Sequence, residues 1–287
     1  MSNPGKSIRG RLLNLAKKEN LSNQLVIIRY MHERLLFRLA MSMYADNFCL
    51  KGGVLLYVFS KEQTRPTLDI DFLGTNIPNE LESLRAAFRN ICQMYYPPDA
   101  VTFDTGSISA EEIAGQDEYP GIRLFVTAIL DTIRQRIQVD IGFGDIVLPA
   151  PVKLSYPTLL PDSGIPVIQA YSLETVIAEK FEAMIDLSVV NSRMKDFYDV
   201  YQILTTQTLD GHLLEESIRA TFENRNTVYS PSHSLFNPDF AVDEGRQRLW
   251  KAFLTRNHLD TSLDFPKVIG RISNVLFPIW ERMSSIP

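Results

Sequence analysis

Residues 50–74 read LKGGVLLYVFSKEQTRPTLDIDFLG, a stretch that joins the glycine pair Gly52 and Gly53 to an Asp-x-Asp strand. Because side chains alternate between the two faces of a strand, Asp69 and Asp71 are predicted to share one face. The opposite face is predicted to carry Leu68, Ile70 and Phe72. Two carboxylates on one face can hold a pair of divalent cations, so the segment predicts a metal-dependent phosphoryl-transfer site.

The glycine pair is predicted to form a phosphate-binding turn beside these carboxylates. It follows a short apolar strand at 48–50 and precedes a helical run at 54–59, whose free N–H groups are available to phosphate oxygens. Lys51 adds positive charge at the same corner. Carboxylate oxygens suit Mg²⁺, and a pair of such ions can activate an attacking oxygen and steady a leaving pyrophosphate. The structural alternative is a tight turn followed by a strand with solvated acids.

The combination of a glycine pair that opens a helix and an Asp-x-Asp strand resembles the nucleotidyltransferase superfamily. Two later segments, AYSLETVIAEKFEAMI at 170–185 and RMKDFYDVYQIL at 193–204, resemble the AbiEii/AbiGii toxin family. That family supplies the toxin half of type IV toxin–antitoxin systems and of abortive phage-infection systems. The resemblance runs in matching order from about Arg29 to Leu204.

Asp140 is a candidate third carboxylate for the metal site. It lies in a predicted strand at 137–143 between Val139 and Ile141, and therefore projects from the face opposite these apolar neighbours. In the superfamily a third acid on a neighbouring strand often ligates the catalytic ion or accepts the proton of the attacking hydroxyl, and the resemblance implies this role for Asp140. The alternative is an edge-strand acid that precedes a glycine turn.

Lys180 lies in a predicted helix at 172–187. Its own side of this helix carries Val176, Ala183 and Leu187. A lysine among apolar groups should be compensated by an anion. The family resemblance implies that Lys180 serves the active site by neutralising triphosphate charge in the transition state. The alternative is a snorkelling surface lysine.

Asp196 and Asp199 are three residues apart and share a face of the next predicted helix. The core side of that helix is predicted to carry Phe197, Val200 and Tyr201. The family resemblance implies that Asp196 is catalytic, either paired with Lys180 or orienting the acceptor, and that Asp199 supports it. The alternative is a favourable carboxylate in a first helical turn, which fits Asp196.

The net charge of −5 over 287 residues argues against nucleic-acid binding over the whole surface, so any RNA would meet a local patch. The N-terminal segment supplies a candidate patch, whose alternative is a solvated helix face. Its members are Lys6, Arg9, Arg11, Lys17, Lys18, Arg29, Arg34 and Arg38.

Cys49 and Cys92 have no CxxC or metal-ligand neighbour and are predicted to be buried thiols in a reducing compartment. No signal peptide or membrane span is evident, which predicts a cytoplasmic protein that does not engage a membrane. The four histidines are scattered, and neither a P-loop nor a dinucleotide-binding glycine motif occurs.

The periodicity predicts strands at 48–50, 68–72, 101–109, 122–129 and 137–143, the last two joined by a turn at Asp131 and Thr132. Helices are predicted at 7–19, 24–44, 54–59, 80–95, 172–187, 195–206, 213–223, 245–255 and 266–283. Residues 148–166 are predicted to form an irregular crossover with one short strand. The expected class is α+β: a nucleotidyltransferase-like mixed β-sheet flanked by helices in residues 1–160, with a helical C-terminal domain in 161–287 that completes the active site.

The resemblance implies an Mg²⁺-dependent nucleotidyltransferase that transfers NMP from an NTP to tRNA or another cellular acceptor, with a cognate antitoxin as partner. Gly53 departs from the serine often found after the first glycine, and the gap from Gly53 to Asp69 is longer than in many relatives. Both departures affect how the nucleotide sits. The alternatives are a small-molecule nucleotidyltransferase of the antibiotic-modifying type and a non-catalytic nucleotide-binding regulator.

Overall fold

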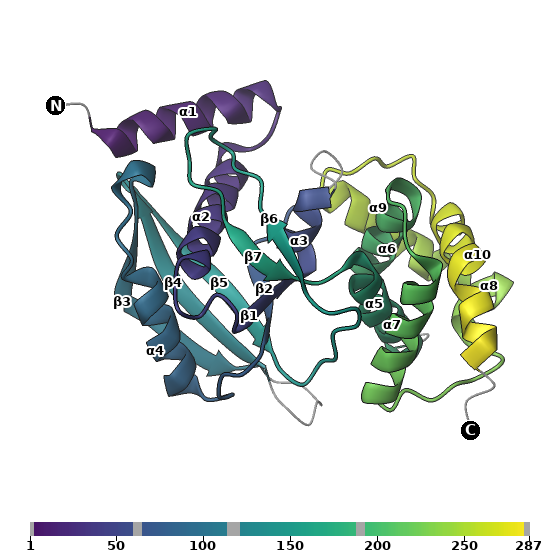
Figure 1. Ribbon diagram of the computed structural model, residues 1–287. Coiled ribbons are helices and arrows are strands. Elements are labelled where there is room, and N and C mark those ends of the chain that lie inside the picture. The colour runs from purple at the N-terminus through teal and green to yellow at the C-terminus, as the bar shows by residue number, and fades with distance from the viewer. Residues whose placement is uncertain (1–2, 60–64, 114–120, 188–192, 284–287) are drawn as a thin grey trace. The chain divides into compact units, whose positions relative to one another are not determined.

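A mixed β-sheet organises the first of two units in this computed structural model, which describes residues 3–59, 65–113, 121–187 and 193–283 (Figure 1). Among the described residues the sheet has seven strands in the order β3-β4-β5-β2-β1-β7-β6. The strands are β1 (Phe48–Lys51), β2 (Asp69–Gly74), β3 (Val101–Glu112), β4 (Ile122–Leu130), β5 (Ile133–Gly142), β6 (Val152–Ser155) and β7 (Val167–Ala170). Two pairings are parallel, β2 with β5 and β1 with β7, and the others are antiparallel. The predicted mixed sheet is therefore confirmed.

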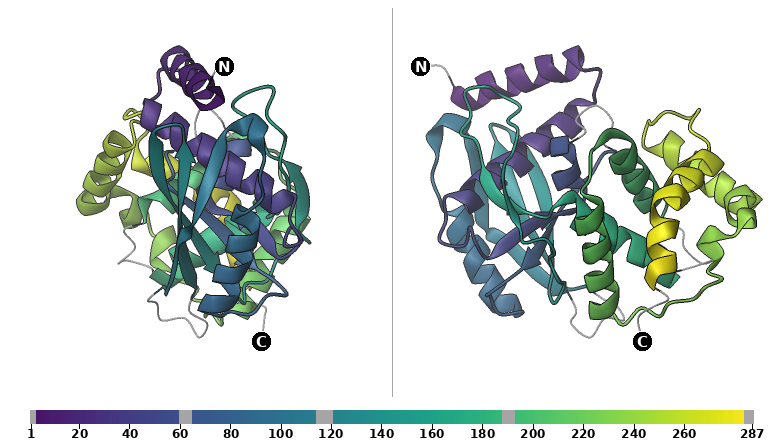
Figure 2. Two further views of the ribbon diagram at one scale, coloured as in Figure 1. Left: turned by 90° about the vertical axis from the view of Figure 1, so that its left-hand side faces the viewer. Right: turned by 45° about the vertical axis from the view of Figure 1, so that its right-hand side comes forward.

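Helices α2 and α4 cover one face of this sheet (Figure 1 and the left view of Figure 2). The helices of the unit are α1 (Pro4–Lys18), α2 (Asn23–Ala40), α3 (Gly52–Phe59), α4 (Leu81–Cys92) and the 3-10 turn η1 (Pro97–Asp99). On the covered face the Phe48 ring lies 5.7 Å from that of Phe72 and 5.4 Å from that of Phe88 on α4. Strand alternation then directs Asp69 and Asp71 to the opposite face.

Strand β2 begins one residue later than predicted, and this corrects the place of Leu68. It precedes the strand and is 64% exposed, whereas Ile70 and Phe72 are buried as predicted. Cys49 and Cys92 are also buried, as predicted.

Two helices end earlier than their apolar pattern suggested. Helix α2 stops at Ala40 instead of residue 44, because the Ser42 hydroxyl bonds to the Leu39 carbonyl and to the Tyr44 N–H in place of a continued helix. Helix α4 stops at Cys92 instead of residue 95, shortly before the proline pair of η1.

Arg34 and Arg38, two members of the predicted basic patch, are fully buried. The Arg38 guanidinium donates hydrogen bonds to both carboxylate oxygens of Asp99, with Nη2 3.0 Å from Oδ1. It also donates to the Val101 carbonyl at 2.8 Å. Arg34 donates to the Gly164 carbonyl at 2.9 Å. These two arginines therefore tie α2 to the loops around it, and the prediction that they face a nucleic acid or solvent is wrong.

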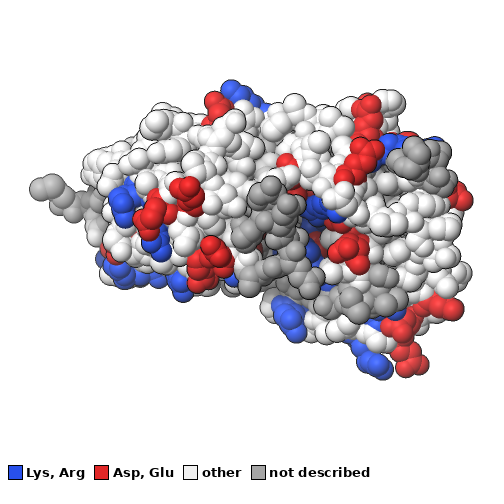
Figure 3. Space-filling view, turned by 90° about the horizontal axis from the view of Figure 1, so that it is seen from below, with Lys and Arg blue, Asp and Glu red and all other residues white. Residues whose placement is uncertain are grey.

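Arg9 and Arg11, also in that predicted patch, are bound to Asp131 and Asp162. The lysines Lys6, Lys17 and Lys18 remain exposed. On the face drawn in Figure 3, cationic and anionic side chains of the described residues are interspersed, and neither sign forms a continuous field there.

The second unit is helical and contains residues 59–65, 145–151 and 171–287. Its elements are α5 (Leu173–Leu187), α6 (Met194–Thr206), α7 (Gly211–Asn224), η3 (Ser234–Phe236), α8 (Pro238–Val242), α9 (Glu244–Arg256) and α10 (Phe265–Met283). Aromatic side chains fill its core, where Phe181 lies 5.4 Å from Phe222 and 6.2 Å from Trp280 between ring centroids. The predicted helical character of this part is confirmed.

Several short elements of the described residues were not predicted from the sequence, among them β7 and α8. Strand β7 has four residues and is stabilised by parallel pairing with β1, a contact that no local pattern records. Helix α8 has five residues, too few to show a helical period. No helix within the described part of the chain is both long and apolar enough to cross a membrane.

Candidate metal centre

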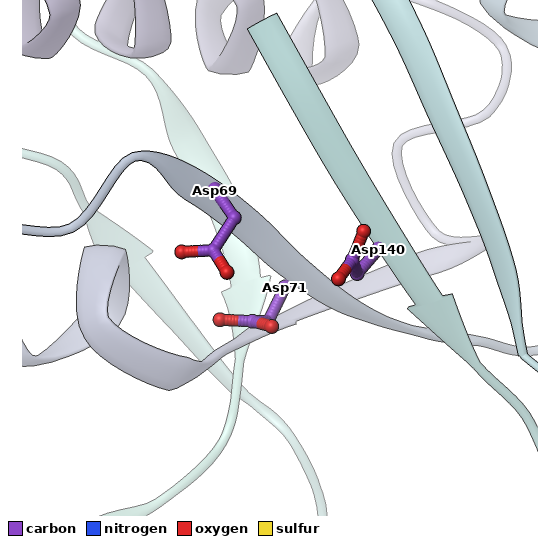
Figure 4. Close-up of side chains that lie close together, drawn as sticks. All are labelled: Asp69, Asp71 and Asp140. Atoms are coloured by element: carbon purple, nitrogen blue, oxygen red, sulfur yellow. The ribbon is translucent and has the colours of Figure 1, made fainter. Parts of the chain in front are cut away.

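Asp69, Asp71 and Asp140 meet on one face of the sheet (Figure 4). Strands β2 and β5 run parallel with Asp71 directly beside Asp140, and Asp69 lies two positions earlier on β2. Each aspartate offers a carboxylate oxygen, and these three atoms all lie within 4.8 Å of one another. An all-oxygen donor set of this size fits a hard divalent cation such as Mg²⁺ or Mn²⁺.

The two central carboxylates belong to a row of four charged residues that crosses the sheet. The strand registers place Lys51 beside Asp71, Asp71 beside Asp140, and Asp140 beside Arg123. Like charges directly opposite each other on a sheet repel, and the outer cations offset that repulsion in part. The row is therefore built around two adjacent negative charges.

The glycine pair packs directly against this row. Gly52 has a left-handed backbone, with φ +69°, and a Cβ placed on it would lie 1.9 Å from Oδ2 of Asp71. A Cβ on Gly53 would lie 2.8 Å from Oγ1 of Thr67. The role of these glycines in a phosphate-binding turn stays a prediction. The structure gives a separate reason for glycine at position 52, because any larger residue there would displace the Asp71 carboxylate.

Hydrogen bonds from neighbouring residues hold the carboxylates in place. The Thr67 hydroxyl donates to Oδ1 of Asp69 at 2.8 Å. Arg123 donates from Nε and Nη2 to the two oxygens of Asp140 at 2.8 and 2.7 Å, and the Gln138 amide reaches both at 3.1 Å. These hydrogen bonds to Asp140 raise the pKa of Arg123. The contacts of Thr67, Arg123 and Gln138 with these carboxylates were not predicted from the sequence.

His32 of α2 lies fully buried beside the start of β2. Burial lowers its pKa to about 4, against the opposing influence of the Asp69 charge and the Leu68 backbone. The imidazole is therefore neutral at physiological pH and adds no positive charge next to the carboxylates.

Strand β5 lies between β4 and β2, so Asp140 is an interior-strand residue. The alternative that it is an edge-strand acid is therefore wrong. The alternation that directed its side chain away from Val139 and Ile141 is seen in the structure, where both apolar neighbours are fully buried. Its role as a metal ligand stays a prediction.

The helical unit contains a separate charged cluster around Lys180. Its Nζ lies 2.7 Å from Oδ1 of Asp196 and 2.9 Å from Oδ2 of Asp199, and its side chain is only 13% exposed. Burial alone would lower the pKa of Lys180, but the charges of Asp199 and Asp196 outweigh it and raise that pKa. The snorkelling alternative is wrong, because the ammonium group points to two buried carboxylates.

Two arginines complete this cluster. Arg65 donates to both oxygens of Asp199 at 3.1 to 3.4 Å, and Nε of Arg193 lies 2.7 Å from Oδ2 of Asp196. Burial alone would raise the pKa of Asp196, but Lys180 and Arg193 outweigh it and lower that pKa. The anion that the apolar setting of Lys180 demanded is thus supplied by the protein itself.

Comparisons with known proteins agree with this architecture. A structure of JHP933 from Helicobacter pylori shares 14% identity, with a TM-score of 0.52 over 92% of this chain and 95% of that one. A structure of a candidate nucleotidyltransferase from H. pylori shares 13% identity, with a TM-score of 0.51 over 93% of this chain and 99% of that one. At such identities the likeness shows the fold, which is nucleotidyltransferase-like as predicted. No curated protein sequence matches this chain.

The family comparison is more specific. The model of the family described as nucleotidyl transferase AbiEii toxin, type IV toxin–antitoxin system, matches residues 34–271. That range includes the glycine pair, the three aspartates and the Lys180 cluster, and it covers most of the chain. The chain therefore belongs to the AbiEii nucleotidyltransferase toxin family.

Proposed function

We propose that this protein is a metal-dependent nucleotidyltransferase that moves NMP from an NTP to a cellular acceptor, with tRNA as the expected acceptor class. The observation that carries the proposal is the meeting of three aspartates on adjacent strands beside a left-handed glycine turn. Membership of the AbiEii family supports the reaction class and a role as the toxin of a type IV system.

Asp69, Asp71 and Asp140 would hold the divalent cations, for which Mg²⁺ is the expected biological choice. Bound there, such cations supply the charge that activates an attacking oxygen and steadies a leaving pyrophosphate. In the balanced reaction an acceptor hydroxyl oxygen bonds to the α-phosphorus, the bond to the bridging α–β oxygen breaks, pyrophosphate leaves, and the hydroxyl proton passes to a base.

The chain's own groups orient the nucleotide in this proposal. Gly52 and Gly53 begin α3, whose first N–H groups have no partner within the helix and are suited to phosphate oxygens. Lys51 is the residue immediately before them and occupies the same charged row as the aspartates. Its ammonium group is proposed to neutralise phosphate charge.

The family motif is the basis for the proposed roles of Lys180, Asp196 and Asp199. Lys180 is assigned to neutralising triphosphate charge, Asp196 to orienting the acceptor or pairing with Lys180, and Asp199 to supporting Asp196. Their mutual ion pairs give each a second, structural reason to be there. A test of their catalytic role must therefore separate loss of activity from loss of stability.

The transfer reaction can be tested with purified protein, Mg²⁺, each α-labelled NTP in turn and total cellular RNA. The matched variants are Asp69→Asn/Asp71→Asn and, as a control for loss of one carboxylate elsewhere in the sheet, Asp104→Asn on β3. We expect label to pass to an RNA band with wild type and with the control, and not with the double variant. No label on RNA from any NTP would refute an RNA acceptor, and no metal-dependent nucleotide binding would refute the enzyme.

The toxin role has its own test. Induced expression is expected to arrest growth, Asp69→Asn is expected to relieve the arrest, and a neighbouring antitoxin gene is expected to suppress it. Equal arrest by wild type and Asp69→Asn would separate toxicity from nucleotide transfer.

A further inference from the structure

The Arg123 guanidinium binds the Asp140 carboxylate, which is also one of the three groups that would ligate a cation. The two residues are directly opposed on β4 and β5, and the guanidinium takes both oxygens in a bidentate geometry at 2.8 and 2.7 Å. One of those oxygens belongs to the set of three that lie within 4.8 Å of one another. A guanidinium on both oxygens and a divalent cation on one of them repel each other at such short range, so each weakens the binding of the other.

The remaining contacts of Asp140 do not depend on Arg123. The Gln138 amide, two residues earlier on the same strand face, reaches both carboxylate oxygens at 3.1 Å. The Arg123 side chain is 34% exposed and so has open space into which it can move. Asp140 can therefore stay oriented when the guanidinium leaves.

We propose that Arg123 is an exchangeable counter-ion for Asp140. When the nucleotide arrives, a divalent cation displaces the Arg123 guanidinium from the Asp140 carboxylate. In the free protein the guanidinium holds down the metal affinity of the three aspartates. The released Arg123 guanidinium then binds two phosphate oxygens of the incoming nucleotide, for which its planar, bidentate N–H donors are well suited. Cation and nucleotide binding thereby become coupled, and by linkage each strengthens the other.

The metal half of this proposal stands on geometry alone, and the nucleotide half rests on the proposed function. In this proposal Arg123 first competes with the cation for Asp140 and then contacts the nucleotide. If it only held Asp140 in place, its removal would weaken cation binding. If it competes with the cation, its removal strengthens binding, so the sign of the change separates the two roles.

The decisive experiment titrates Mn²⁺ into nucleotide-free protein and follows the free-ion electron paramagnetic resonance signal. Arg123→Gln is expected to bind Mn²⁺ about tenfold more tightly than wild type, because one positive charge close to the ion is gone. The matched control is Arg134→Gln, which removes one positive charge from the same hairpin. Arg134 pairs with Asp104, which is not one of the three aspartates. The control is expected to leave Mn²⁺ affinity within about twofold of wild type.

A second titration measures the coupling between Mn²⁺ binding and nucleotide binding. A non-hydrolysable NTP analogue is expected to tighten Mn²⁺ binding by wild type, and to tighten it by a clearly smaller factor in Arg123→Gln. Thermal melting checks that Arg123→Gln folds, and added Mn²⁺ is expected to raise the Tm of this variant more than that of wild type. If Arg123→Gln does not fold, Arg123→Lys replaces it, and its affinity is expected to lie above that of wild type because a single ammonium group releases Asp140 more easily.

Unchanged or weaker Mn²⁺ binding by the folded variant would overturn the proposal, as would equal coupling in variant and wild type. Failure of the enzyme hypothesis would look different. In that case no nucleotide would be transferred by wild type, while tighter Mn²⁺ binding by Arg123→Gln would still support the counter-ion role of Arg123.

Discussion

Replacing Gly52 by alanine is expected to disable the candidate metal centre with only a modest loss of fold stability. The new Cβ would lie 1.9 Å from Oδ2 and 2.9 Å from Cβ of Asp71, whereas ordinary contact begins at 3.4 Å. The Asp71 carboxylate must therefore retreat by about 1.5 Å, the difference between these contact distances. The left-handed φ of +69° adds about 1–2 kcal/mol of backbone strain for a residue with a side chain.

These two effects act on different observables. A misplacement of about 1 Å in a catalytic constellation costs on the order of 100-fold in rate, so we expect at least that loss in nucleotide transfer. Metal affinity should fall as well, because one ligand has moved out of the donor set. Strain of about 2 kcal/mol corresponds to a fall of roughly 4–8 °C in Tm for a unit of this size.

The assay pairs a Mn²⁺ titration with thermal melting and labelled-NTP transfer. Gly10→Ala is the matched control, because Gly10 lies inside α1 and nothing stands within 4 Å of its added Cβ. It should bind Mn²⁺ like wild type and gain stability slightly, by about 0.5–1 kcal/mol. Wild-type Mn²⁺ affinity in Gly52→Ala would refute the argument that this glycine makes room for Asp71.

Three further changes test the charged groups. Lys180→Met should lower the free energy of unfolding by about 3 kcal/mol in urea titrations, because it leaves Asp196 buried beside one fewer cation, and Lys180→Met/Asp196→Asn should recover part of that loss. Arg38→Met should cost a similar amount, about 3–5 kcal/mol, since Asp99 loses its bidentate partner, and a change below 1 kcal/mol would contradict the assigned burial. The folded-state pKa of His32 is lowered to about 4 from 6.5, so the unfolded chain binds more protons between these values and stability falls as the pH drops through that window. Relative to His32→Gln, wild type measured in EDTA should lose about 2 kcal/mol between pH 7 and pH 5, and parallel pH profiles would refute this.

Local alternation predicted much of the geometry of the candidate metal centre. The two-residue period placed Asp69 and Asp71 on one face, and the same rule directed Asp140 away from Val139 and Ile141. The sequence did not reveal that β5 is an interior strand. That fact depends on the parallel pairing of β5 with β2, which joins segments far apart in the chain.

The position of Arg123 opposite Asp140 is predictable from the sequence. The predicted turn at Asp131 and Thr132 fixes the hairpin register, and counting equally outward from it brings Arg123 opposite Asp140, as the structure has it. Its ion pair with Asp140 follows from that register, since directly opposed residues share a face.

Other features lay outside what local patterns record. Arg34 and Arg38 look like a solvated helix face, but the sheet and loops that bury them come from later parts of the chain. The Lys180 cluster was predictable from the sequence only in part. Its need for an anion followed from apolar neighbours, whereas Arg65, which neutralises Asp199, precedes it by more than a hundred residues.

The proposed function requires that the three aspartates form one divalent-cation site. Its most direct test is the Mn²⁺ affinity of wild type beside Asp71→Asn, Asp140→Asn and the control Asp104→Asn, an exposed carboxylate of the same sheet. We expect the two site variants to lose at least tenfold in affinity, roughly 1.4 kcal/mol or more, while the control binds like wild type. Equal Mn²⁺ binding by all four proteins would contradict it.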